Sequence, residues 1–380
     1  MNQPTRSHIK AMDLVRAITI VSVVAVHSTW FTAQGASSVT AGLLLNWLHF
    51  TREGFMALTG FVLTYSVITR PPRWLQFWKK RYRLVLFPYL IWSALYMALK
   101  VPVWPPLAYL AHWLQSLPTG SAWFHLYYLL ITMQFYLVFP LFMILMHWAR
   151  KFPWRVLGTS LLFEVLLITY DQYVVHGSGS GINAYTGVEV WTYAWYFVLG
   201  GVMAVHWPRV SLWIEKNVKL LAKLLMGALM VSAGTYLVQW RLTGSVDFAD
   251  SVLQPTTILF STVLFLNLAG WGLIVEKNMS AWLARGSLIE RISDRSFGIY
   301  LLHPMILAVL MYGWGSLHTA MNPWILDALT ITLVVTISYQ IIGLLGRTHL
   351  SPWLIGRAAY LVQEEVRIPR PSPSQVSLSE

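Results

Sequence analysis

Long apolar segments dominate this sequence, and they constrain its fold class more than any other feature. About ten of them approach the ~20 residues that a helix needs to cross a bilayer. They lie near residues 12–33, 42–67, 84–104, 125–147, 156–174, 190–206, 217–240, 251–274, 297–316 and 324–346. Because lipid offers no partners to backbone N–H and C=O groups, such segments form helices. We therefore predict an all-α protein, a polytopic membrane bundle of about ten transmembrane helices.

The composition agrees with a membrane protein. Charged residues make up 11% of the chain and hydrophobic residues 56%, whereas a soluble domain has about 25% charged residues. Cysteine is absent. This absence excludes disulfides, thiolate metal sites and an acyl-cysteine intermediate.

The positions of the basic residues predict the orientation of the bundle. If the N-terminus is cytoplasmic, almost every Lys and Arg falls in a cytoplasmic connection, as the positive-inside rule requires. Lys100 and Arg241 are the exceptions, and Arg16 and Arg52 lie within spans. We expect a multi-pass protein of the cell membrane with both termini in the cytoplasm. The net charge of +12 then reflects topology, not nucleic-acid binding.

The chain is expected to divide into a membrane domain, residues 1–350, and a cytoplasmic tail, residues 351–380. The tail is rich in Pro and Ser, which predicts disorder over most of it. The first span is longer than a signal-peptide core and has no cleavage site, so we expect no separate signal peptide. The aromatic connection from Pro105 to Trp123 is expected to lie in the membrane interface or to fold back toward the bundle.

Two ionisable residues share one face of the first span. Arg16 and His27 are eleven positions apart, which on a helix places them on nearly the same side, ~16 Å apart along the axis. Charged and ionisable groups are expensive at this depth and mark functional sites by default. Asp13, three residues before Arg16, is within one turn of it. A structural histidine between helices and a functional pair both fit this spacing.

The second span and the segment after it add further candidates. His49 and Glu53 are four residues apart, a spacing suited to orienting an imidazole, although Glu53 could simply neutralise Arg52. Thr59 and Gly60 suit close helix packing. A basic run at the mouth of the third span could orient the chain or could hold a phosphorylated ligand. Its candidate phosphate ligands are Lys80, Arg81 and Arg83.

Later segments contain a third group of candidates. Trp123, His125 and Tyr127 could belong to an interfacial aromatic belt or could contact a ligand. Glu164 lies in the middle of the fifth span, where a lone acid requires a partner. His303 could line a cavity or could adjoin a helix distorted by Pro304.

Taken together, these segments resemble the membrane acyltransferase-3 family. The family is marked by an Arg-x10-His motif in its first span, often after an Asp, and by four further motifs in a set order. Here the Arg-x10-His motif is Arg16 to His27, and the others correspond to Phe55–Phe61, Lys80–Tyr89, His125–Leu129 and Ser296–Pro304. The resemblance runs from about residue 10 to 346. Thr59 replaces the usual serine and keeps its hydroxyl, Met56 replaces a phenylalanine, and the basic segment carries more charge than is typical.

The resemblance implies an O-acyltransferase of the stand-alone branch, whose members modify polysaccharides with acetyl or succinyl groups. Acetyl-CoA or succinyl-CoA would be the co-substrate, without a metal. The donor's phosphates would be held on the cytoplasmic side by Arg16, Lys80, Arg81 and Arg83. His27 would act as general base or carry the acyl group transiently, with His49, Glu53 or Glu164 orienting it or tuning its pKa. The extracytoplasmic glycan acceptor would be contacted by His49, Trp123, His125, Tyr127 and His303.

The residues alone also fit a proton-coupled secondary transporter or a glycan flippase, because such proteins carry buried His, Arg and Glu. Transporters commonly contain two related halves, and the sequence has no convincing internal repeat. A transporter would not consume acyl-CoA. The sequence leaves open the acyl group, the acceptor, the oligomeric state, and the choice between direct transfer and an acyl-histidine intermediate.

Overall fold

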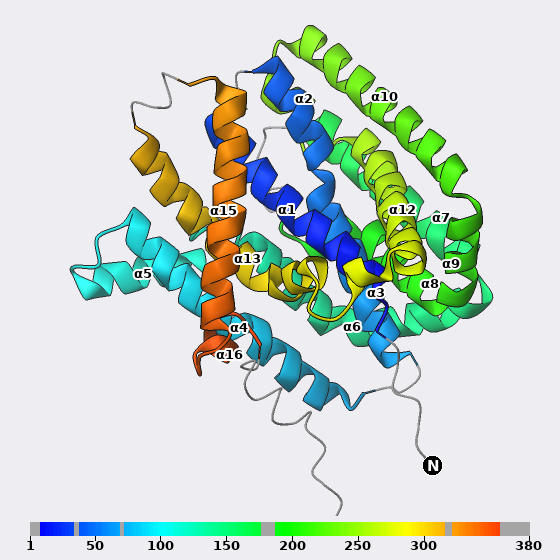
Figure 1. The fold of residues 1–380 in the computed structure, drawn as a ribbon, viewed down its shortest axis with the longest axis horizontal. Coiled ribbons are helices and arrows are strands. Elements are labelled where there is room, and N and C mark those ends of the chain that lie inside the picture. The colour runs from blue at the N-terminus through cyan, green and yellow to red at the C-terminus, as the bar shows by residue number, and fades with distance from the viewer. Residues whose placement is uncertain (1–7, 34–37, 69–71, 176–186, 316–320, 358–380) are drawn as a thin grey trace, which may run out of the picture.

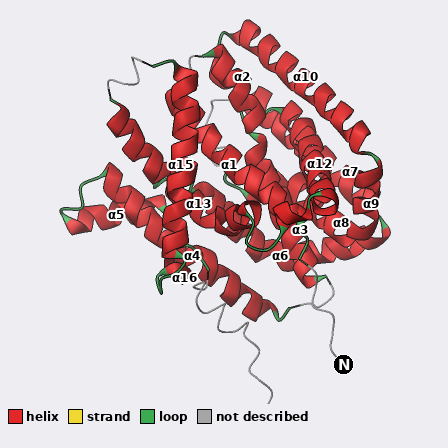
Figure 2. Ribbon diagram, in the orientation of Figure 1, coloured by secondary structure: helices red, strands yellow, loops and turns green. Residues whose placement is uncertain are grey.

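A computed structural model describes residues 8–33, 38–68, 72–175, 187–315 and 321–357. All regular elements in these ranges are helical (Figure 2). The longer helices are α1 (Ala11–Thr32), α2 (Val39–Leu48), α3 (Phe50–Val67), α4 (Trp74–Lys100), α5 (Pro106–Ser116), α6 (Tyr127–Lys151), α7 (Pro153–Tyr170), α8 (Ala194–Val205), α9 (Trp207–Lys216), α10 (Val218–Thr243), α12 (Pro255–Asn278), α13 (Leu288–Trp314) and α15 (Pro323–Leu345). Short turns of helix are α11 (Val246–Ala249), α16 (Ser351–Leu354), η1 (Asp171–Val175), η3 (Val190–Tyr193) and η4 (Ser280–Leu283).

The structure confirms the predicted all-α membrane bundle. Among the described residues, seven helices are long and apolar enough to cross a membrane, namely α1, α4, α6, α10, α12, α13 and α15. Helices α8 and α9 are bent by 98° at their junction. Counting this pair as one broken span raises the number of candidate spans in the described residues to eight. The remaining expected spans also form helix. Helices α3 and α7 are less apolar because they contain Arg52 and Glu53, and Arg155 and Glu164.

Helix α1 is the central element of the bundle. In Figure 1 it crosses the middle of the molecule behind α15, and it packs against α3, α12, α13 and α15. Its sequence is a run of small and β-branched apolar residues, so it packs closely on several sides. One consequence is that the polar groups on α1, Asp13, Arg16 and His27, face other protein elements and not lipid.

The expected second span is divided at His49, where α2 ends and α3 begins. Helix α3 then packs closely on α8. At their crossing the backbone of Gly60 lies against Phe197, and that of Gly200 lies against Ala57. The small residue predicted at position 60 therefore does allow close helix packing.

Two peripheral segments, α5 and residues 351–357, pack on α4. Helix α5 projects from the side of the bundle (Figure 1) and is held to α4 by a 2.5 Å hydrogen bond from Tyr109 Oη to the Ala94 carbonyl oxygen. Its Leu107 and Leu114 are exposed, as expected for a helix at the membrane interface. Residues 351–357 pack on α4, where Trp92 Nε1 donates to the Leu354 carbonyl oxygen at 2.8 Å. The rest of the expected tail lies outside the described residues.

Candidate active site

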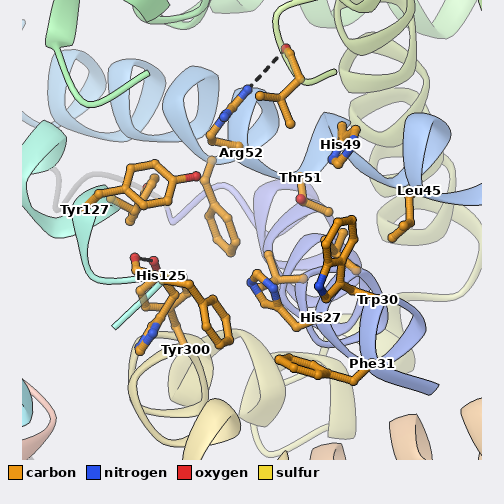
Figure 3. A pocket seen from close by; sticks show the side chains of 16 residues that line it. His27, Trp30, Phe31, Leu45, His49, Thr51, Arg52, His125, Tyr127 and Tyr300 are labelled. Carbon is orange, nitrogen blue, oxygen red and sulfur yellow. Dashed lines mark hydrogen bonds between the residues drawn. The ribbon is translucent and has the colours of Figure 1, made fainter. Parts of the chain in front are cut away.

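His27 lines a cavity of about 430 Å³ in the middle of the bundle. Figure 3 shows its imidazole facing the same space as His49, with Tyr127 and His125 on another side. Four elements form the walls: α1, the junction of α2 and α3, the start of α6, and α13. Most of the lining is aromatic or aliphatic. Ionisable groups therefore meet beside a largely apolar surface, where electrostatic interactions and hydrogen bonds are stronger than in water.

Two further histidines lie beside His27. The His303 ring stacks on the His27 ring with centroids 5.3 Å apart and an interplanar angle of 22°. The His125 ring meets that of His303 edge to face at 5.6 Å. His303 Nδ1 donates to the carbonyl oxygens of Tyr300 at 2.8 Å and Ile299 at 3.1 Å. Neutral His303 therefore carries its proton on Nδ1, and its buried Nε2 is an acceptor with no partner among the described residues.

The wall opposite His27 carries Arg52. Its Nη2 donates to Glu53 Oε1 at 2.8 Å and to the Val252 carbonyl oxygen at 3.3 Å, and its guanidinium lies over the Tyr193 ring at 5.0 Å. Glu53 itself does not line the His27 cavity. It borders a separate small void together with Glu164, which accepts a 3.1 Å hydrogen bond from the Trp195 amide.

Arg16 lines a second cavity, of about 180 Å³, with Arg81, Thr59 and Ser296. Arg16 Nη1 donates to Ser293 Oγ at 3.5 Å, and Ser293 Oγ donates to Asp13 Oδ1 at 3.0 Å. Two guanidinium groups therefore line one recess near the N-terminal end of α1. This pairing suits a ligand with more than one negative charge.

Asp13, which accepts the hydrogen bond from Ser293, also pairs with a residue that precedes the first span. Asp13 Oδ2 lies 2.6 Å from His8 Nε2. His8 precedes the first span, and its hydrogen bond to Asp13 raises the pKa of its imidazole above the ordinary value against the opposing effect of partial burial. Asp13 is thus shared between His8 and Ser293 and does not contact Arg16 directly.

The two cavities share an aromatic wall. Phe55, Tyr128 and Tyr300 line both of them. Tyr300 Oη donates to the carbonyl oxygen of His125, which holds this ring in place. A ligand extending from Arg16 to His27 would have to pass between these three side chains.

The predicted site residues divide into four groups. Those lining the His27 cavity are His27, His49, His125 and Tyr127, and those lining the Arg16 cavity are Arg16 and Arg81. The ring of His303 stacks on the ring of His27 but does not line its cavity. The others lie apart: Glu53 faces the Glu164 void, Lys80 and Arg83 are exposed, and Trp123 lines a third cavity beside Lys100.

Sequence reasoning missed most of the aromatic residues that shape the site. Phe124 contacts the His27 ring at 4.6 Å between centroids, and Phe55, Tyr128 and Trp30 also line its cavity. Aromatic residues recur throughout the apolar segments, and spacing along one helix does not show which of them face an inner cavity. No cluster of three or more His, Cys, Asp or Glu side chains suited to a metal ion occurs among the described residues.

Comparisons with known proteins identify the family of this chain. The sequence model of the family described as "Acyltransferase domain" (acyltransferase-3) matches residues 9–343. Two curated relatives from Staphylococcus epidermidis, one of them from strain RP62A, bear the name "Probable poly-beta-1,6-N-acetyl-D-glucosamine export protein". Each is 23% identical over 249 residues, which cover 62% of this chain and 63% of the relative. The match therefore covers somewhat less than two thirds of the relatives' length. No solved structure matches the chain.

Proposed function

This chain belongs to the acyltransferase-3 family and is a multi-pass membrane acyltransferase, and on that premise we propose its reaction. We propose that it transfers an acetyl or succinyl group from cytoplasmic acyl-CoA to a hydroxyl group of an extracytoplasmic glycan. The observation that carries this proposal is the pair of adjoining cavities along α1, one holding Arg16 and Arg81 and the other holding His27.

Two adjoining cavities, one of them carrying two guanidinium groups, support an extended donor that bears phosphates. Arg16 and Arg81 would bind the donor's phosphates, and the exposed Lys80 and Arg83 would attract it to the cytoplasmic mouth. The donor's narrow arm would pass Phe55, Tyr128 and Tyr300, so that its thioester reaches His27. The ~16 Å rise of α1 between Arg16 and His27 sets the length that this arm must span.

In direct transfer, His27 acts as the general base. It accepts the proton of the acceptor hydroxyl while the hydroxyl oxygen attacks the thioester carbonyl carbon. The C–S bond then breaks, and His27 returns the proton to the departing thiolate of CoA. An acyl-histidine route on His27 is the second possibility, with the thiolate leaving before the hydroxyl attacks. Both routes yield one ester and one free CoA.

The acceptor would occupy the part of the cavity lined by His49, His125 and Tyr127. His49 and Tyr127 offer hydrogen-bonding groups, and His125, whose ring nitrogens are buried, contributes to an aromatic wall suited to a sugar ring. The printed name of the relatives concerns a poly-β-1,6-N-acetylglucosamine, so we infer a polymer or oligomer of this type as the first acceptor to test. The His303 ring stacks on the His27 ring and supports it. Trp123 lines the neighbouring cavity beside Lys100, next to the proposed acceptor. Glu53 acts only through its hydrogen bond with Arg52.

The relatives' name also motivates a second candidate function. They are named export proteins, and a buried Arg–Glu pair with a second acid nearby suits coupled transport as well. This candidate is a proton-coupled transporter or glycan flippase. Transport would move the glycan without consuming acyl-CoA.

The proposed function is tested by following thiol release from purified protein. Acetyl-CoA and succinyl-CoA are supplied with a β-1,6-linked N-acetylglucosamine oligosaccharide, and donor binding is measured separately by calorimetry. Loss of the general base in His27→Ala should lower the rate by roughly 10²–10⁴-fold while donor affinity stays unchanged. His112→Ala, on the exposed surface of α5, is the matched control.

Wild-type protein that binds and consumes neither donor would contradict the acyl-CoA assignment and favour the export function. Retained turnover in His27→Ala would assign the base to another residue.

A further inference from the structure

A third cavity lies beyond His27, at the end of the bundle opposite Arg16. It has a volume of about 430 Å³ and is lined by α1, α4, α13 and the segment before α6. Phe31 and Phe124 line both this cavity and the His27 cavity. Their ring centroids are 6.2 Å apart, and Phe124 touches the His27 ring. One pair of aromatic rings therefore separates the third cavity from the reacting centre.

The lining of the third cavity is apolar except at one end. Phe31, Phe124, Pro304, Leu307, Ala308 and Met311 form most of its surface. A free glycan would leave many hydroxyl groups without hydrogen-bond partners against such a wall, which is unfavourable. A hydrocarbon chain would instead be well accommodated. On the same stretch of α13, Val309 and Tyr312 are 64% and 92% exposed, so this helix also borders the lipid.

The polar end of the cavity is formed by Lys100 and Trp123. Lys100 Nζ donates to the Ser121 carbonyl oxygen at 2.9 Å and lies 5.4 Å from the centroid of the Trp123 ring. An ammonium group has three N–H donors, so two remain for a ligand. No carboxylate lies within ion-pair distance of Lys100 in the described part of the chain. Lys100 is also one of the two cations that the positive-inside rule places on the far side of the membrane.

We propose that this third cavity binds the phosphate-bearing isoprenoid lipid on which the acceptor glycan is carried. The phosphate contacts Lys100, the hydrocarbon chain lies along Leu307 and Met311, and the first sugars pass Phe31 and Phe124 toward His27. This inference rests on the proposed function, because it deepens the identity of the acceptor from a glycan to a lipid-linked glycan.

The first test is direct binding, which requires no turnover. Farnesyl phosphate, farnesol and inorganic phosphate are titrated into the full-length protein in lipid nanodiscs. We expect farnesyl phosphate to bind more tightly than either of the others. Lys100→Gln should weaken its binding about tenfold, as expected for loss of a charge-assisted contact, and Lys100→Arg should retain it. The control is Arg241→Gln, which removes the other far-side cation from an exposed end of α10.

A second variant tests the apolar part of the site. Leu307→Trp fills the cavity and should weaken both farnesyl phosphate and farnesol. Three outcomes would overturn the proposal: unchanged binding in Lys100→Gln, equal loss in Arg241→Gln, or displacement of farnesyl phosphate by phosphatidylglycerol at similar concentration. The last outcome would identify a general anionic-lipid site.

The acyl-transfer test uses one glycan in two forms, linked to a polyprenyl diphosphate or released from it. In Lys100→Gln the KM for the linked form should rise about tenfold, while the KM for acyl-CoA stays unchanged. Equal use of both forms by the wild-type protein would contradict the proposal. Farnesyl phosphate binding without any CoA release would contradict the proposed function but retain the lipid site.

Discussion

His27 and His303 lie ring to ring, but their hydrogen bonds differ. His303 Nδ1 is tied to the Ile299 and Tyr300 carbonyl oxygens, which specifies its tautomer. His27 makes no hydrogen bond to the described residues and faces an open cavity. A general base must reach the substrate, and His303 is fully buried and does not line the His27 cavity. These local differences favour His27 over His303 for the proposed role of general base.

Ser293 is a positioning residue for Arg16. Its hydroxyl links the Arg16 guanidinium to Asp13, and the two charged groups make no direct contact. We expect Ser293→Ala to raise the KM for acyl-CoA about threefold to tenfold with little change in kcat, because a hydrogen bond to a charged group is lost before donor binding. Steady-state kinetics with varied donor concentration measures this split.

Ser293→Thr keeps the hydroxyl and should largely restore the KM. Ser211→Ala on α9 removes a serine that lines none of the three cavities and serves as the control. An unchanged donor KM in Ser293→Ala would remove the positioning role.

Among the elements, α3 and α8 form the tightest crossing. A methyl group added at Gly200 would overlap the Ala57 carbonyl group, so the two backbones would have to separate. Gly200→Ala should lower the free energy of unfolding by about 1–3 kcal/mol, as overpacking does. Gly227 on α10 has open space around its Cβ position, and Gly227→Ala should be stabilising by on the order of 0.5–1 kcal/mol. Thermal unfolding of both variants in one detergent compares them, and equal shifts would contradict the packing argument.

Three different helices contribute the aromatic wall between the Arg16 cavity and the His27 cavity. Phe55 lies on α3, Tyr128 on α6 and Tyr300 on α13. We expect Phe55→Ala to open this wall and admit water to the thioester, so that CoA release without an acceptor increases severalfold. The measurement is thiol release from acetyl-CoA alone. Phe163→Ala, on the exposed face of α7, controls for loss of an aromatic ring. Unchanged hydrolysis would show that the wall does not limit water access.

At the scale of the whole molecule, three cavities follow one another beside α1. They contain in turn Arg16 and Arg81, then His27, then Lys100. Helices α1, α4 and α13 all begin at the Arg16 end, as their shared cavity residues show. The Arg16 cavity and the Lys100 cavity therefore lie on opposite sides of the His27 cavity.

The absence of cysteine allows the membrane orientation to be tested cleanly, since every introduced thiol is a unique label site. Lys151 ends α6, and Gln115 lies on α5; both side chains are exposed. With a cytoplasmic Arg16 end, a membrane-impermeant maleimide should label Gln115→Cys in intact cells and Lys151→Cys only after permeabilisation. The reverse pattern would invert the topology and place the donor recess outside the cell.

Much of the architecture was predictable from the sequence because it depends on local properties. The helical segments follow from apolar length, and the shared face of Arg16 and His27 follows from helical periodicity. The spacing of residues along one helix did not by itself identify the partner of a charged side chain. Either His49 or Arg52 could have been the partner of Glu53, and in the structure Glu53 pairs with Arg52 and faces the Glu164 void. Similarly, of the three basic residues predicted to hold phosphate, only Arg81 lines the Arg16 cavity.

Local properties of the chain are enough to specify a helical membrane bundle with an arginine and a histidine on one buried face. Helix formation in lipid and helical periodicity require no knowledge of distant residues. The packing of the helices, in contrast, specifies which aromatic rings surround His27, that His303 stacks on it, and that separate recesses hold Arg16 and Lys100. These features depend on helix crossings such as that of α3 and α8, and a crossing brings together residues far apart in the chain.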